Sequence, residues 1–124
     1  MFTYGVYHIC EKIQVSNLKY VNIITLDMTI NSAFSNQVFW RPVACYRIGH
    51  LVVLNAYIQN NNAIRSTGTI IGTITKYKPD RIAYAITGLG TVIRFETNGN
   101  IIVDTTNMPM GNNLFQLLYY SKDI

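Results

Sequence analysis

Two apolar, strand-like runs meet at the dipeptide Asn98-Gly99, and this arrangement restricts the possible folds more than any other feature of the sequence. Residues 91–97 and 100–104 are rich in β-branched and aromatic side chains, which favour extended strands. Asn and Gly both tolerate positive φ, so a two-residue type I′ turn is favoured between the two runs. The sequence therefore predicts an antiparallel hairpin with residues 98 and 99 at its tip.

Similar apolar runs, separated by turn-forming residues, recur along the chain. Between residues 20 and 30, the apolar residues Ile24, Leu26, Met28 and Ile30 alternate with polar ones, which is the period of a half-buried strand. Further strands are predicted at residues 51–58, 69–75, 82–87, 92–97, 101–103 and 114–120. Strands at this spacing predict an all-β fold, an antiparallel β-sandwich of jelly-roll type.

Glycine, proline and asparagine mark the breaks between these strands. Gly72 lies inside the run at residues 69–75, where a glycine indicates a bulge or the close approach of another backbone. In the sequence Lys78-Pro79-Asp80, proline is preset for a type I turn. The cluster Asn60-Asn61-Asn62 predicts a tight loop after the strand at residues 51–58.

The chain length of 124 residues is that of one domain, so a single domain is predicted over residues 1–124. A hydrophobic fraction of 49% supplies ample material for one core. Residues 2–19 are predicted as a strand, although Ile9 and Ile13 also fit a helical turn. For residues 1–22 two alternatives stay open: an extension of the domain, or a strand that pairs between subunits.

Charge is scarce, and the surface has to be built largely from Asn, Thr, Ser and Tyr. Only 13% of residues are charged, and the net charge of +4 comes from bases that are scattered along the chain, which does not favour nucleic-acid binding. No apolar run approaches the ~20 residues of a membrane helix, and we expect a soluble, unprocessed chain. A weakly charged, hydrogen-bonding surface suits sugar recognition or subunit packing.

Metal and disulfide chemistry are weakly supported. His8 and Cys10 would share one face of a strand, and Cys45 and His50 would complete a tetrahedral set, but their spacing matches no zinc signature. We therefore expect no metal and no cofactor. A disulfide between Cys10 and Cys45 stays open as the less favoured alternative to two buried thiols.

Catalytic signatures are also missing. No Gly-x-Ser-x-Gly motif occurs, and the carboxylates have structural explanations: Asp80 belongs to a turn, and Glu96 pairs with Arg94 on one strand face. We therefore expect no enzyme, with polysaccharide cleavage as the third alternative. Trp40, the single tryptophan, is assigned to core packing or a subunit contact ahead of stacking on a sugar.

Loops are the natural place for recognition, because a rigid β-scaffold presents its connecting segments to solvent. The amides of the asparagine cluster could contact a glycan, and a tyrosine and a carboxylate lie near the following proline turn. The predicted ligand-binding residues are Asn60, Asn61, Asn62, Tyr77 and Asp80.

One stretch of the chain resembles a known family. Residues 45–58 (CYRIGHLVVLNAYI), followed by GTIIGTI at 68–74, YKP at 77–79, VIRFE at 92–96 and NGNII at 98–102, are similar to the terminal head domain of phage tail-fibre and baseplate receptor-binding proteins. The likeness covers residues 41–103. Thr75-Lys76 stands where that family usually has a Pro-x-Gly turn, and Ala56 replaces a frequent glycine.

The resemblance implies a function as well as a fold. It implies a β-sandwich head, usually a homotrimer, that is carried on the virion and attaches to a bacterial cell-surface glycan beside other tail or baseplate proteins. Such a protein would be made in the bacterial cytoplasm. The alternative is a structural module that caps a fibre and supports trimerisation without binding a ligand. The shared motif marks the scaffold and carries no binding residue.

Overall fold

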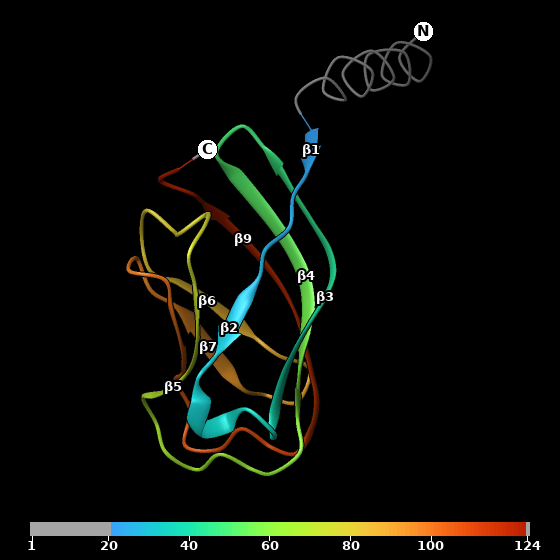
Figure 1. The fold of residues 1–124 in the computed structure, drawn as a ribbon, viewed down its shortest axis with the longest axis vertical. Coiled ribbons are helices and arrows are strands. Elements are labelled where there is room, and N and C mark those ends of the chain that lie inside the picture. The colour runs from blue at the N-terminus through green and yellow to red at the C-terminus, as the bar shows by residue number, and fades with distance from the viewer. Residues whose placement is uncertain (1–20, 124) are drawn as a thin grey trace, which may run out of the picture.

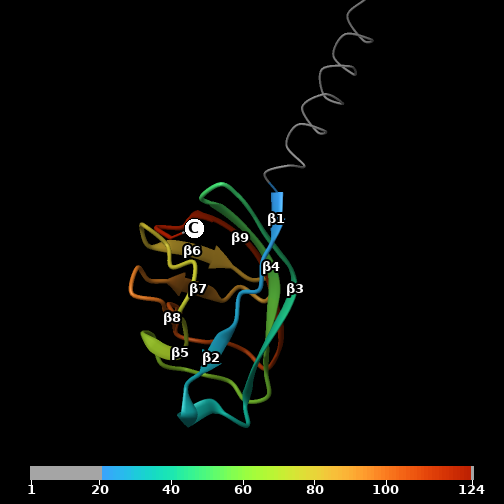
Figure 2. The ribbon, with the colours of Figure 1, turned by 45° about the horizontal axis from the view of Figure 1, so that its top comes forward.

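The structure is a computed structural model that describes residues 21–123, and it consists of two antiparallel sheets packed face to face (Figures 1 and 2). The four-stranded sheet has the order β1-β3-β4-β9, with bounds Val21–Ile23, Val38–Ile48, Leu51–Asn60 and Gly111–Tyr120. The five-stranded sheet has the order β2-β5-β8-β7-β6, with bounds Met28–Ile30, Thr69–Ile74, Asn100–Val103, Val92–Phe95 and Ala83–Ile86. A single turn of 3-10 helix, η1, spans Ser32–Phe34.

The predicted all-β antiparallel sandwich is confirmed. The chain passes between the two sheets at four connections, β1–β2, β2–β3, β4–β5 and β8–β9. Here β3–β4, β6–β7 and β7–β8 are hairpins whose strands pair directly within one sheet. These short connections keep sequence neighbours adjacent, which is the commoner arrangement of consecutive strands.

The core fills the space between the sheets with side chains from both. Its aromatic centre links the sheets: the ring centroids of Phe95 and Phe115 are 6.1 Å apart in an edge-on arrangement, and that of Trp40 lies 6.2 Å from Phe115. Offset and edge-on pairs of this kind add to the hydrophobic gain of burying the rings. Trp40 is partly buried and packs against the core, which is one of the two roles that the sequence left open for it.

Strand β3 is missing from the sequence prediction, and Pro42 explains why. A proline inside an apolar run argues against a central strand because it has no N–H to donate. The structure accommodates it with a β-bulge: Pro42 pairs with Ala56 and Ala44 with Asn55, which leaves Val43 as the extra residue. Beyond the bulge, β3 continues to Ile48 and turns into β4 through Gly49 and His50.

The predicted strand over residues 20–30 is split between the two sheets. β1 pairs with β3, and β2 pairs with β5, so residues 24–27 cross from one sheet to the other along the side of the sandwich (Figure 1). The period-two pattern still holds across the crossing, because Leu26 and Met28 are buried while Thr25 and Asp27 are exposed. Alternation predicted the buried side chains correctly and the continuous strand wrongly.

The hairpin at residues 98 and 99 is confirmed, but its turn is not type I′. The Glu96 N–H donates to the Asn100 carbonyl and the Gly99 N–H to the Glu96 carbonyl, both at 2.9 Å, which encloses a three-residue loop. Gly99 has a φ of 95°, whereas Asn98 does not have a positive φ. The loop is therefore the kind that ends in a left-handed glycine. Asn98 Oδ1 accepts the Asn100 N–H at 3.0 Å.

Both features predicted at Gly72 occur. A bulge lies between Ile70 and Gly72 where β5 pairs with β8. A Cβ at Gly72 would lie 2.7 Å from Met28 Sδ and 2.9 Å from the Thr29 carbonyl oxygen, so the glycine lets β2 approach. The predicted turn at Pro79 differs from the structure, because Pro79 forms an antiparallel bridge with Ser121.

The amino-terminal predictions are not tested by the structure. The strand at residues 2–19, with His8 and Cys10, lies outside the described residues. Within residues 21–123 no helix is long and apolar enough to cross a membrane.

Candidate functional site

Residues 24–27, here called the strap, close one side of the sandwich between β3 and β5. The Ile24 N–H donates to the Cys45 carbonyl at 3.1 Å, and the Trp40 indole N–H donates to the Leu26 carbonyl at 2.8 Å. Leu26 is buried in the core. The strap is thus fixed by a backbone bond, an indole bond and one buried side chain, although it belongs to neither sheet.

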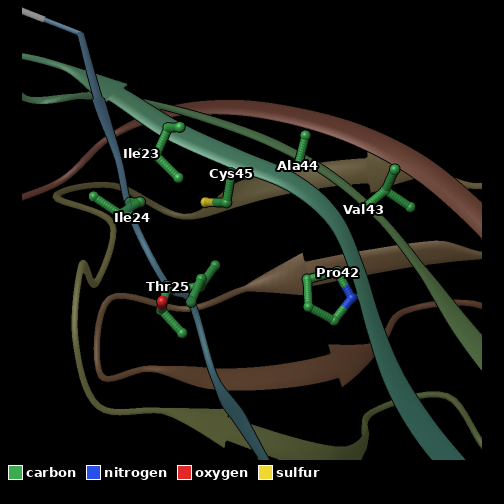
Figure 3. Close-up of a pocket in the computed structure, with 8 residues that line it drawn as sticks. Ile23, Ile24, Thr25, Pro42, Val43, Ala44 and Cys45 are labelled. Atoms are coloured by element: carbon green, nitrogen blue, oxygen red, sulfur yellow. The ribbon is translucent and has the colours of Figure 1, made fainter.

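An apolar pocket of about 230 Å³ lies between the strap and the bulge of β3 (Figure 3). The extra residue bends β3, as bulges do, and Val43 stands on the far side of the strand with 68% of its surface exposed. Burial raises the pKa of the Cys45 thiol to about 11, so it stays protonated at neutral pH and acts as an apolar side chain. The pocket is lined by Ile23, Ile24, Thr25, Leu26, Pro42, Val43, Ala44 and Cys45.

A polar pocket of about 130 Å³ also adjoins the strap and is lined by Thr25, Asp27, Thr75 and Lys76. Thr25 lines both pockets, so they are neighbours. No hydrogen bond or ion pair to another residue of the described segment occupies the Asp27 carboxylate or the Lys76 ammonium. Both groups are therefore free to bind hydroxyl groups, the carboxylate as acceptor and the ammonium as donor.

Asn60, a predicted ligand residue, has a structural role instead. It is 1% exposed. Its amide nitrogen donates to the carbonyls of Met108 (3.1 Å) and Pro109 (3.3 Å), and its oxygen accepts from Gln37 Nε2 (3.2 Å) and the Asn62 N–H (3.3 Å). Such a fully bonded buried amide ties loops together. Only Asn61 and Asn62 of the cluster are exposed.

Tyr77 and Asp80, the other predicted ligand residues, lie at the opposite end of the sandwich. Asn60 pairs with Gly111 at the start of β9, whereas the Asp80 N–H donates to the carbonyl of Tyr120 at its end, 2.9 Å away. A ten-residue strand spans about 30 Å. The structure therefore does not bring the five predicted residues together.

Tyr77 is the one described non-glycine residue with a positive φ, 56°. Its N–H donates to Asp123 Oδ2 and its carbonyl accepts from the Tyr119 hydroxyl, both at 2.8 Å. Partial burial acts to raise the pKa of Asp123, but hydrogen bonds from the Tyr77 backbone, the Ser121 side chain and other backbone groups outweigh it and lower the pKa. These bonds hold the loop that carries Thr75 and Lys76.

The remaining polar clusters have structural roles. Buried Asn113 Oδ1 accepts from the hydroxyls of Thr91 (2.8 Å) and Thr87 (3.3 Å), which satisfies all three groups between the sheets. Arg94 lies 3.5 Å from Glu96 and 2.9 Å from Asp104 on the outer side of the five-stranded sheet. The predicted Arg94–Glu96 pair is confirmed.

The residues considered for a metal do not form a site in the described segment, where no group of three His, Cys, Asp or Glu side chains is close enough to hold an ion. Cys45 is a free thiol beneath the strap, and His50 Nδ1 lies 2.9 Å from the Ser121 carbonyl in the β3–β4 turn. His8 and Cys10 precede the described residues.

The pocket residues were missed by sequence reasoning, although two signals were present. Thr25 and Asp27 are the polar positions of the alternating run, and Pro42 inside an apolar run is typical of a bulge. What the sequence did not show is that the run crosses between sheets and places these residues beside Thr75 and Lys76.

Comparison with known proteins gives no further assignment. No protein-family model, no curated protein and no solved structure matches this chain.

Proposed function

We propose that this chain is a non-enzymatic adhesion domain of a phage virion that contacts a bacterial cell-surface saccharide at the strap. The proposal joins the sequence resemblance over residues 41–103 to one structural observation: a polar pocket with an unpaired carboxylate and ammonium next to an apolar one. In the proposed virion the domain is a homotrimer that neighbours other tail or baseplate proteins and needs no cofactor.

A saccharide is the ligand class that such a pair of pockets fits best. Sugar rings carry hydroxyl groups on their edges and C–H groups on their faces. Asp27 and Lys76 would bind hydroxyls, while Pro42 and Ile24 in the neighbouring pocket offer apolar contact. Each pocket is smaller than the roughly 300 Å³ at which sites for drug-sized ligands begin. One or two sugar units of a surface polymer would suit this size.

The test is binding of the purified protein to a glycan array and to host cells. We expect Asp27→Ala and Lys76→Ala each to weaken binding at least tenfold, since each removes a hydroxyl partner. The double variant Asn61→Ala/Asn62→Ala is the matched control, because it alters exposed polar side chains at the predicted loop, and it should bind like the wild type. Loss of binding in that control alone would place the site at the loop, and a wild type that binds no glycan or cell would contradict adhesion.

The second candidate is a structural module that caps a fibre and supports its assembly. It is favoured by the outer side of the four-stranded sheet, which exposes Leu114, Leu118 and Tyr120. It predicts stable self-association with no glycan affinity. Polysaccharide cleavage needs a second carboxylate at the site, and Asp27 is the one carboxylate among the described residues that line the polar pocket.

A further inference from the structure

The four-stranded sheet has an outer face, directed away from the core, that is unusually apolar. Along β9, Leu114, Gln116, Leu118 and Tyr120 alternate with buried residues, so they point outward. Leu114 and Leu118 are 56% and 55% exposed. We define the outer face as these side chains together with those opposite them on β4, β3 and β1.

Strand register arranges the outer face in rows. Each row lies two residues further along the strands than the one before it. The first row contains Tyr46, Val53 and Leu118, the second contains Asn55 and Gln116, and the third contains Tyr57 and Leu114. Val53, at the middle of its row, is 6% exposed. The amide row is thus flanked on one side by the row of Tyr46, Val53 and Leu118, and on the other by Tyr57 and Leu114, whose row ends at Arg41 on β3.

Charge is nearly missing from this surface. The strands β1, β3, β4 and β9 contain no Asp or Glu, and Arg41 is the one cation that they direct outward. Its guanidinium lies 5.3 Å from the ring centre of Phe39 and bonds Gln59 at 3.4 Å. Binding a nucleic acid or an acidic protein would require clustered cations on this face. The face therefore favours a partner surface that also carries little charge.

The size of the face fits a protein interface. Three strands of ten or eleven residues and the three-residue β1, spaced about 4.8 Å apart, cover roughly 500 Å² in projection. A standard interface buries about 800 Å² of accessible surface on each partner, and a pleated, side-chain-covered face exceeds its projection. The largest apolar patch on an ordinary monomer is about 300–600 Å².

We propose that the outer face packs against a second copy of this chain. Asn and Gln each carry a donor and an acceptor, so the row of Asn55 and Gln116 can pair with the same row of a copy, which rows of like charge cannot do. The flanking apolar rows then meet apolar rows. The inference shares with the proposed function only the expectation of self-association, and it adds the surface responsible.

The test measures the mass of the full chain by light scattering over a range of concentrations. Leu118→Glu and Leu114→Glu place a carboxylate on the outer face, where burial against a copy would leave it unpaired. Both residues are largely exposed in one protomer, so the variants should fold, and circular dichroism checks this. Ile86→Glu is the matched control, an aliphatic residue 72% exposed on the outer side of the five-stranded sheet.

We expect an oligomer for the wild type and Ile86→Glu, and a dissociation constant at least 100-fold higher for each Leu variant. A wild type that stays monomeric, or an oligomer that withstands both Leu variants, would overturn the proposal, as would coverage of the face by residues 1–20 or by another protein. The outcome separates from that of the proposed function: loss of the oligomer in both Leu variants supports this surface whatever the number of copies, and glycan binding is scored independently.

Discussion

The two hairpins β3–β4 and β7–β8 both turn at a glycine with positive φ, but they differ in whether another strand packs against the turn. Gly49 has a φ of 60° and Gly99 a φ of 95°. A Cβ at Gly49 would meet nothing within 4 Å, whereas one at Gly99 would collide with the carbonyl oxygen of Ile74. The first turn is held mainly by its own strands, and the second packs onto β5.

The difference shows what sets strand register. At Gly49-His50, a two-residue turn joins Ile48 directly to its partner Leu51. At Asn98-Gly99, the same two-residue turn would pair Phe95 with Ile102 and would turn Ile101 and Val103 away from the core, because a one-residue slip reverses every side chain. The observed pairing of Phe95 with Ile101 buries both residues. Core packing overrides the local preference of Asn-Gly.

The largest expected effect comes from removing the side chain that selects this register. Phe95→Ala should lower the free energy of unfolding by about 3–5 kcal/mol, the usual cost of a phenylalanine cavity in a core. Phe95 is fully buried and contacts Phe115 and Tyr119. Urea unfolding measures the change. Tyr46→Ala, in the other hairpin and only half-buried, is the control, and an equal loss there would remove the distinction between the hairpins.

The turn glycines give the next largest effect. Gly99→Ala should cost about 3 kcal/mol, the upper end for a strained residue, because the collision adds to the positive φ. Gly49→Ala should cost about 1–2 kcal/mol, the conformational cost alone. Thermal or urea unfolding of both variants measures the gap, and similar losses would mean that β5 does not constrain the β7–β8 turn.

A smaller effect is expected at Asn98. Asn98→Ala removes the acceptor for the Asn100 N–H and should cost about 1 kcal/mol. Asn98→Asp keeps an acceptor and should retain most of that stability. If the alanine variant were as stable as the wild type by urea unfolding, the bond would have no part in the turn.

The smallest effect concerns Asp123, which fixes the chain near the β3–β4 turn. Its pKa is lowered in the folded protein, so its contribution to stability is present above the unfolded pKa of about 3.9 and is lost as the pH falls through the folded pKa. The difference in unfolding free energy between the wild type and Asp123→Asn should therefore shrink on going from pH 6 to pH 2. A constant difference would contradict this origin.

Much of the fold was predictable, because buried and exposed positions follow the period of two even where the chain is not a strand, as at Leu26 and Asp27. Turn type, the strand containing Pro42 and the change of sheet in the strap were not predictable, since each depends on contacts between distant segments. The site was predicted less well. Asn60 fits a loop by local rules, but its amide is used by Gln37 and Met108, far away in the sequence.

The indole of Trp40 is bonded to the strap and is the single tryptophan of the chain. Its fluorescence therefore reports on the contact between β3 and the strap. Detachment of residues 24–27 would shift the emission to longer wavelength while both sheets persist, and occupation of the neighbouring pockets would alter it without any label. Trp40 is thus an intrinsic fluorescent probe next to the proposed saccharide site.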